Sequence, residues 1–371
     1  MKFSSLIALA CLPWSRAATL YTTIGSCEDL EAAAAATSTS DVEAEMVVDT
    51  VTCDEWTTLE ITNNRLKLTD PSAEFVDRTY LVNVRFVVYS VLRIDMSTQL
   101  SSSDEEGNPS DTNGALLYVA EGGRARFMST TFISDTAVVD PPTGEGGCVH
   151  TEGLLRVDSD LIMSGCSITD TTGSLAPSGG GMWIGESGQL IVKGYFSQGG
   201  CEAVSSSDSL ESMGGGMYNA GKVSTFSDSD FAGNTASVGG GIYNTGVIKI
   251  LRDYGYFVSN SASGRGACHL FNSGEVRMKG GGEFYNSAAL AEDSDGGAVI
   301  NTGSLTINEF AIFDNNQCQR FGGAIANYAN ATLRLTETST FTENYVIGDF
   351  GESYDCDDIY MESDSGYTCG P

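Results

Sequence analysis

Basic side chains are concentrated at one position of a short recurring pattern. The pattern is apolar–x–apolar, and it occurs ten times between Leu66 and Leu335. Seven of its ten central residues are basic, namely Lys67, Arg93, Arg126, Arg156, Lys249, Arg277 and Arg334. Like charges held close together repel one another, so such a row is suited to binding a linear polyanion such as a polyuronate or a sulfated glycan. The alternative is a solubilising face whose cations pair with nearby acidic side chains.

The apolar–x–apolar pattern is typical of a short β-strand. Successive side chains of a strand point to opposite faces, so the two apolar residues face a core and the central residue faces outward. The last residues of successive copies lie 25 to 35 positions apart. A coil of that length cannot bury its apolar face alone, whereas stacked coils share one continuous core.

Two further motifs accompany the copies. Gly-Gly segments such as 322–325 precede the strand, and Phe-x-x-Asn follows it at Phe231, Phe257, Phe313 and Phe341. Stacking would align the rings as an internal ladder and place the asparagines at corners, where Asn tolerates a left-handed backbone. A second asparagine column consists of Asn219, Asn244, Asn272, Asn301 and Asn327.

These patterns predict an all-β chain, a right-handed parallel β-helix of about ten coils. Ser26 and Asp29 form a capping box before an Ala-rich run, which predicts a capping helix over 26–37. The expected organisation is a signal peptide at 1–17, an N-terminal cap at 18–45, the β-helix at 46–350 and a C-terminal cap at 351–371.

Gly-Gly-Ala-Ile at 322–325 and Phe-x-x-Asn at 341–344 resemble the repeat pair of chlamydial polymorphic outer-membrane proteins. The resemblance covers roughly residues 110–350 and implies a solenoid of the pectin-lyase-like type. Members of that family are surface adhesins, usually exported through a C-terminal β-barrel. The sequence after Asn344 has no room for such a barrel, so the resemblance implies an adhesin-like passenger module alone.

A second outward column follows the Gly-Gly segments and includes Trp183, Tyr218 and Tyr243. Aromatic faces can stack on sugars, which makes these residues further candidates for glycan binding, although packing beneath a loop is the simpler role. Acidic insertions such as 104–106 precede the Gly-Gly segments and would emerge along one edge. Their carboxylates leave Ca²⁺ binding open without matching a calcium-loop spacing, and no other cofactor is expected.

The cysteines suggest disulfides at both ends of the molecule. Cys27 with Cys53, and Cys356 with Cys369, are candidate pairs because each pair is close in sequence. The more central cysteines are expected to be small unbonded core residues, and they are Cys148, Cys166, Cys201, Cys268 and Cys318. Asn330 begins an Asn-Ala-Thr glycosylation sequence.

Export is indicated by the first seventeen residues. Lys2, an apolar run from Leu6 to Leu12 and a small-residue cleavage site after Ala17 are typical of a signal peptide. The chain contains 49 acidic and 19 basic residues, with a net charge of −30. That charge argues against nucleic acid as a partner. We therefore expect a secreted extracellular protein without a membrane anchor.

The favoured function is that of a non-catalytic surface or matrix protein that binds an anionic polysaccharide along the basic strand face. A polysaccharide lyase or epimerase acting on polyuronates is the second hypothesis, because many β-helices act on polysaccharides. The two histidines, His150 and His269, lie in different coils and show no catalytic spacing, so enzyme function is left uncertain but disfavoured. The third hypothesis is a structural adhesin whose partner is a cell-surface protein.

Overall fold

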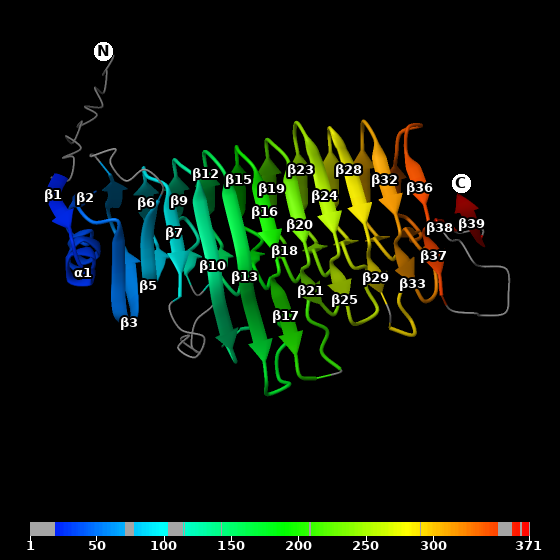
Figure 1. Cartoon of the computed structure of the whole chain (residues 1–371), viewed down its shortest axis with the longest axis horizontal. Coiled ribbons are helices and arrows are strands. Elements are labelled where there is room, and N and C mark those ends of the chain that lie inside the picture. Colours follow the sequence, from blue (N-terminus) through cyan, green and yellow to red (C-terminus); the bar gives the residue numbers. More distant parts are fainter. Residues whose placement is uncertain are drawn as a thin grey trace, which may run out of the picture.

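The strands stack side by side into one elongated solenoid, with their directions nearly perpendicular to its long axis (Figure 1). The computed structural model describes residues 19–70, 78–102, 114, 116–141, 143–207, 209–289, 291–347, 358–363 and 366–370. The single helix of this part, α1 (Cys27–Ala36), lies at the N-terminal end (Figure 1). The predicted all-β parallel solenoid is confirmed.

One face of the solenoid is a twelve-stranded parallel sheet, called here sheet A. Its last ten strands are the ten predicted apolar–x–apolar segments, and β1 and β2 extend the sheet into the segment predicted as a cap. In spatial order the strands are β1 (Thr19–Ile24), β2 (Asp41–Met46), β4 (Arg65–Thr69), β6 (Val91–Ile94), β9 (Arg124–Phe127), β12 (Leu154–Val157), β15 (Gln189–Val192), β19 (Lys222–Thr225), β23 (Val247–Ile250), β27 (Glu275–Met278), β31 (Ser304–Ile307) and β35 (Thr332–Arg334).

The other strands form three rows that complete each coil. The first row follows sheet A in the chain and contains β7 (Thr98–Ser101), β10 (Thr131–Val139), β13 (Leu161–Asp170), β16 (Phe196–Gly199), β20 (Ser229–Ala232), β24 (Tyr254–Val258), β28 (Gly281–Tyr285), β32 (Ala311–Asp314) and β36 (Thr340–Thr342). The second row contains β17 (Glu202–Ser205), β21 (Thr235–Ala236), β25 (Ser261–Ala262), β29 (Ala288–Ala289), β33 (Gln317–Cys318) and β37 (Tyr345–Val346). The long strands β3 (Thr50–Ile61) and β5 (Thr79–Val88) span more than one row, and β10 and β13 of the first row continue into the second.

The third row leads back to sheet A. It contains β8 (Leu117–Val119), β11 (Val149–Thr151), β14 (Met182–Ile184), β18 (Met217–Asn219), β22 (Ile242–Asn244), β26 (Leu270–Asn272), β30 (Val299–Asn301), β34 (Ile325–Asn327) and β38 (Ile359–Ser363). Strand β39 (Gly366–Gly370) pairs antiparallel with β38 at the C-terminal end. A β-hairpin thus stands beside the last coil, where an open parallel edge would otherwise be exposed.

The predicted phenylalanine ladder forms the core of the C-terminal half. Consecutive ring centroids are separated by 5.2 Å (Phe231–Phe257), 4.8 Å (Phe257–Phe284), 4.6 Å (Phe284–Phe313) and 5.0 Å (Phe313–Phe341). The rings are within 10° of parallel, because each occupies the same position of a parallel strand one coil away. All except Phe341 are buried.

Both predicted asparagine columns are hydrogen-bonded ladders in the interior. In the second column, each side-chain amide donates to the next side-chain oxygen, with N···O distances of 2.7, 2.8, 2.8 and 2.6 Å from Asn219 to Asn327. The corner column differs from the prediction in one detail. The left-handed backbone falls on the residue before each asparagine, such as Ser259, Asn315 and Glu343, with φ values of 52° to 53°.

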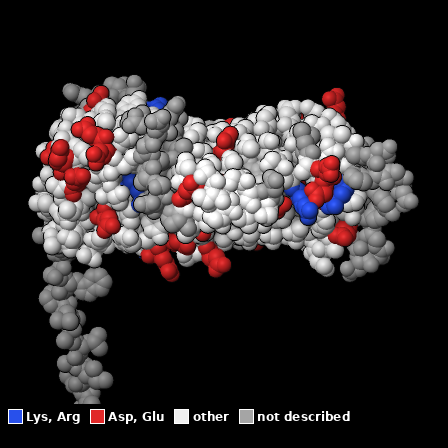
Figure 2. Space-filling model, turned by 90° about the horizontal axis from the view of Figure 1, so that it is seen from below, with Lys and Arg blue, Asp and Glu red and all other residues white. Residues whose placement is uncertain are grey.

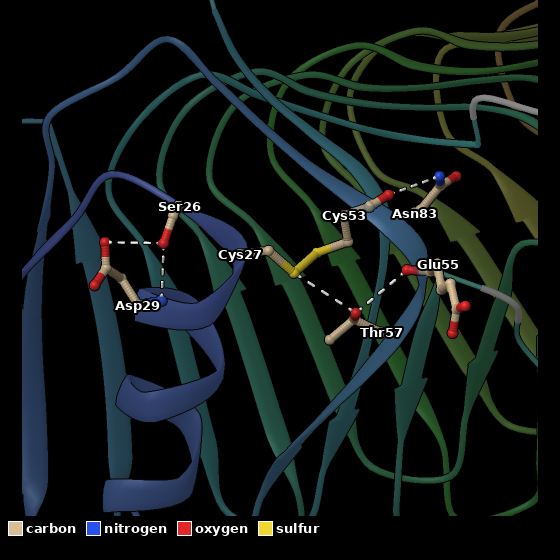
Figure 3. The surroundings of a disulfide bond; sticks show 7 residues. All are labelled: Ser26, Cys27, Asp29, Cys53, Glu55, Thr57 and Asn83. Carbon is tan, nitrogen blue, oxygen red and sulfur yellow. Dashed lines mark hydrogen bonds between the residues drawn. A yellow bond between two sulfur atoms is a disulfide. The ribbon is translucent and has the colours of Figure 1, made fainter.

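The predicted N-terminal cap is confirmed in its helix and its disulfide. Ser26 accepts a hydrogen bond from the amide of Asp29 at 3.2 Å and so caps α1. Cys27 at the start of α1 is bonded to Cys53 of β3, which ties the helix to the open end of the solenoid (Figure 3). Asn83 of β5 donates to the carbonyl of Cys53 at 3.0 Å and extends the same attachment to the next coil.

The prediction for the central cysteines was wrong for one pair. Cys148 and Cys166 form a second disulfide between the third and first rows of one coil. Their sequence positions hid this pairing, because the two residues meet only when the coil closes. Cys201, Cys268 and Cys318 are buried and unbonded, as predicted. The proposed partner of Cys369, Cys356, lies outside the described residues.

Candidate functional site

All seven predicted cations lie in one straight column on the outer face of sheet A. The strand register pairs Lys67 with Arg93, Arg93 with Arg126, and Arg126 with Arg156. It also pairs Lys249 with Arg277, while Thr306 separates Arg277 from Arg334. Ile191 and Ser224 interrupt the column between Arg156 and Lys249. The sequence pattern therefore placed these side chains correctly.

The N-terminal half of this column is neutralised by carboxylates from the same face. Lys67 forms an ion pair with Glu43 of β2, and Arg93 pairs with Asp95 at 2.5 Å. Beyond them, Arg126 and Arg156 share a single carboxylate, that of Asp158, at 2.5 and 2.8 Å. These four cations already have internal counter-ions.

Asp158 is the centre of the largest of these ion-pair groups. Lys193 approaches its Oδ1 atom at 2.8 Å, so three cations surround one carboxylate. Only 8% of the Asp158 side chain is exposed. Burial acts to raise its pKa, but hydrogen bonds from Lys193, Arg156 and Arg126 outweigh burial and lower that pKa well below its usual value.

The C-terminal half of the column has few counter-ions. Within the described residues, Lys249 and Arg334 have no carboxylate within 4.0 Å, and Arg277 has only Glu275 at 3.4 Å. Lys279, two positions after Arg277, is likewise unpaired and exposed. A shallow surface depression lies between these strands, and its lining is Arg277, Ser304, Thr306, Asn308, Thr332 and Arg334.

Sequence reasoning missed the polar neighbours of the cations in this depression. Ser304, Thr306 and Asn308 are the alternate, outward-facing positions along and just after β31, and Thr332 is the matching position of β35. Their alternation was visible in the sequence, but short hydroxyl side chains are common on outward strand faces. Together they offer hydroxyl and amide groups between two guanidinium groups, an arrangement suited to an oxyanion-bearing ligand.

The predicted aromatic residues form a separate outer ladder on the third row. Tyr118, His150, Trp183, Tyr218, Tyr243 and Phe271 stack in this order, with centroid distances of 4.4 to 6.0 Å and interplanar angles of 4° to 25°. Each ring covers the face of its neighbour. Trp183, Tyr218 and Tyr243 therefore present mainly their edges outward, which does not favour stacking on sugars.

The corner beside this ladder is acidic rather than basic. A surface depression between β14 and β18 is lined by Glu152, Trp183, Glu186, Ser187, Tyr218 and Ala220. Ser187 donates to the carboxylate of Glu152 at 2.8 Å. The aromatic candidates and the basic candidates thus lie on different rows and are not brought together into one site.

Acidic side chains are scattered over the side of the molecule seen from below, whereas basic side chains are few there (Figure 2). In the described part of the chain, no group of three or more His, Cys, Asp or Glu side chains is arranged to hold a metal ion. Residues 104–106 lie outside the described residues. Asn330 is exposed on a turn with a φ of 68°.

A short segment of the C-terminal half matches a known protein family. Residues 311–328 match the Chlamydia polymorphic membrane protein repeat. The matched segment runs from β32 to the turn after β34, and it includes one rung of each asparagine ladder. No curated protein and no solved structure matches the chain.

The repeat match and the parallel solenoid together indicate a surface or adhesin-like β-helix. Among the residues that the structure describes, no helix is both long and apolar enough to cross a membrane.

Proposed function

We propose that this chain is an exported, non-catalytic β-helix that binds an anionic polysaccharide along the C-terminal half of the basic column. The observation that carries the proposal is the contrast within the column. Its first four cations have internal counter-ions, whereas Lys249, Arg277 and Arg334 have almost none, and the last two line an open depression.

The spacing of the cations fits an extended polymer. Neighbouring strands of a parallel sheet lie about 4.8 Å apart, so the column repeats with a short, fixed period along the solenoid axis. Unpaired cations at this spacing repel one another, and the carboxylates or sulfates of a polyanion would relieve that repulsion. Arg277 and Arg334 supply planar guanidinium groups, which bind carboxylate and sulfate oxygens in pairs.

The lining of the depression favours binding over catalysis. A lyase or epimerase needs a base beside the cation that neutralises the uronate carboxylate. The six lining residues include no histidine, tyrosine or carboxylate. The buried His150 and His269 lie on the third row and at its start, and neither lines the depression.

The test is retention of the whole secreted protein on a sulfated glycan and on a polyuronate, at low and high salt. The double variant Arg277→Glu/Arg334→Glu is expected to lose retention by roughly tenfold or more, because it replaces two attractive charges with repulsive ones. High salt is expected to weaken the wild type through screening.

Arg265→Glu is the matched control, because it reverses one charge on an exposed loop pair with Asp293, away from sheet A. Its retention is expected to stay within about twofold of the wild type. Equal retention of the double variant and the wild type would refute the proposal. Unsaturated uronate products in the same samples would instead support the lyase.

A further inference from the structure

A second surface, mainly in the C-terminal half, combines aromatic rings with carboxylates that lack cationic partners. It lies on the first row, from β16 to β32, around the corner from sheet A. We call it the tyrosine–carboxylate face, and it consists of Tyr195, Asp228, Asp230, Tyr254, Tyr256, Glu283, Tyr285, Phe310 and Asp314. None of these side chains belongs to the basic column or to its depression.

The strand register brings these residues together. Asp230, Tyr256 and Glu283 occupy equivalent outward positions of β20, β24 and β28. Tyr285 and Asp314 are equivalent positions of β28 and β32. The coils of β20, β28 and β32 therefore each place at least one carboxylate on this face, and the intervening coil of β24 places Tyr254 and Tyr256 there. Neighbouring coils lie about 4.8 Å apart.

The aromatic rings of this face are arranged differently from those of the outer ladder. Tyr256 and Tyr285 are tilted by 50° at a centroid distance of 5.7 Å, and Tyr254 and Phe310 by 51° at 6.2 Å. Tilted rings do not cover each other's faces, so part of each π-surface stays open to a ligand. Tyr254 is 37% exposed.

The carboxylates of this face lack cationic partners. No Lys or Arg lies within 4.0 Å of Asp228, Asp230, Glu283 or Asp314 in the described part of the chain, although Asp95, Asp158 and Asp295 are each paired with arginine. Two contacts within the face hold it in place. Tyr195 donates to Asp230 at 2.9 Å, and the amide of Tyr254 donates to Asp228 at 3.4 Å.

The negative potential of these carboxylates contributes to raised pKa values of the neighbouring tyrosines. The pKa of Tyr254 is raised above its ordinary value, first by the charge of Asp228 and then by burial, Glu283 and Asp253. Burial together with Glu283 raises the pKa of Tyr285 to about 12. A negative field beside open aromatic faces attracts organic cations, through carboxylates and through cation–π contacts together.

We propose that the tyrosine–carboxylate face binds a cationic polysaccharide, a polymer of amino sugars with protonated amines, that lies along the solenoid axis. Its ammonium groups meet the carboxylates that the coils of β20, β28 and β32 contribute, and its sugar rings pack on the tilted aromatic faces. A glycan is favoured over a basic peptide because the face is a broad row of rungs, without the groove or free sheet edge that peptides usually occupy.

The probe is a glucosamine hexamer, titrated against the whole protein by calorimetry at low and high salt. Asp230→Asn/Glu283→Gln keeps the shape of both side chains and removes two charges from the face. Its affinity for the hexamer is expected to fall by roughly tenfold. Tyr254→Ala is expected to weaken binding by roughly threefold through the loss of one cation–π contact.

Glu31→Gln/Glu60→Gln is the matched control, because Glu31 of α1 and Glu60 of β3 lie at the N-terminal end and the variant also loses two charges. It is expected to bind the hexamer as the wild type does. Arg277→Glu/Arg334→Glu is also expected to bind the hexamer as the wild type does. This result would separate the present proposal from the one for the basic column.

Three outcomes would overturn the inference. One is unchanged affinity of Asp230→Asn/Glu283→Gln. The second is equal binding of a fully N-acetylated hexamer, because the ligand would then be recognised without its charge. The third is binding of poly-lysine in the absence of hexamer binding, which would identify a basic peptide as the partner.

Discussion

The two halves of the solenoid keep their coils in register by different means. Residues 19–205 contain both disulfides of the described part, Cys27–Cys53 and Cys148–Cys166, and the carboxylate-centred ion pairs of sheet A. Residues 214–346 contain the stacked phenylalanines and the two asparagine ladders, with no disulfide among the residues described there.

This difference bears on where ligands can bind. In the N-terminal half, the outward cations of sheet A are bound to Asp95 and Asp158 and help to hold neighbouring coils together. In the C-terminal half, interior ladders fix the register, so the outward positions are free for other roles. Lys249, Arg334 and all of the tyrosine–carboxylate face except Tyr195 lie in that half.

Removing a disulfide is expected to have the largest effect, and to affect one half only. Cys27→Ser/Cys53→Ser opens a loop closed over a sequence separation of 26 residues. The expected loss is about 3 kcal/mol of unfolding free energy, measured by chemical denaturation. Because each coil of a solenoid contacts only its neighbours, amide exchange should speed up in β1 to β5 and stay unchanged from β20 onward. Equally faster amide exchange in both halves would show that the disulfide stabilises the whole solenoid and not the N-terminal half alone.

The repeat made the C-terminal half more predictable than the N-terminal half. Phe231, Asn234 and their counterparts have one structural role in every coil, so their spacing predicted both ladders. The Cys148–Cys166 disulfide could not be predicted in this way, because it joins two rows of a single coil and has no counterpart elsewhere in the sequence. The start of the solenoid at β1 was also missed, since Thr19–Ile24 does not show the apolar–x–apolar pattern.

The positions of the cations in the candidate site could be predicted from the sequence, but their ion pairs with carboxylates could not. Strand alternation placed Arg126 and Arg156 correctly in the column. Their partner Asp158 lies just after β12 and reaches both cations only because the coils stack. The tyrosine–carboxylate face was missed because Tyr254, Asp230 and Glu283 come from three different coils. Their common position becomes evident only from the strand register.

His269 marks a break in the otherwise regular ladder of the C-terminal half. The corner column has Ser287 where an asparagine is expected, and its amide donates to Asn316 as the ladder residues do. The side-chain amide of Asn260 therefore has no asparagine oxygen in the next coil to donate to. Instead, the Nδ1 atom of His269 lies 2.9 Å from the amide nitrogen of Asn260. In the two following coils, Ala298 and Ala324 occupy the position of His269.

His269→Ala alone is therefore expected to destabilise the protein by about 2 kcal/mol, because it leaves a cavity and an unpaired amide. His269→Ala/Ser287→Asn is expected to recover most of that loss by completing the ladder. The measurement is the unfolding free energy of the single and double variants at pH 7.5. A double variant no more stable than His269→Ala would show that the histidine does not replace a ladder rung.

The pH dependence of the unfolding free energy provides a second test of the role of His269. Burial lowers the pKa of His269 to about 3, so the folded state keeps the imidazole neutral, whereas the unfolded chain takes up a proton below its ordinary value of 6.5. Stability from this group is therefore complete above pH 6.5 and decreases as the pH falls, by roughly 1.4 kcal/mol per pH unit. His150, whose pKa burial lowers to about 4, adds a second contribution of the same sign. The double variant should lose about 2 kcal/mol less than the wild type between pH 6.5 and pH 5.

The smallest expected effect on stability comes from Asp158, and it tests whether internal counter-ions are what separates the two halves of the basic column. Asp158→Asn leaves Arg126, Arg156 and Lys193 without a shared carboxylate. The expected cost is about 1 kcal/mol at low salt, since the side chains of Arg126, Arg156 and Lys193 are 39%, 32% and 46% exposed and solvent screens them. Because the released cations are then available to a ligand, retention on a sulfated glycan should increase.

Asp293→Asn, which frees only the exposed Arg265, is the control and should change neither property. If Asp158→Asn lost stability without gaining retention, the column would be a structural feature in this half, whatever its counter-ions.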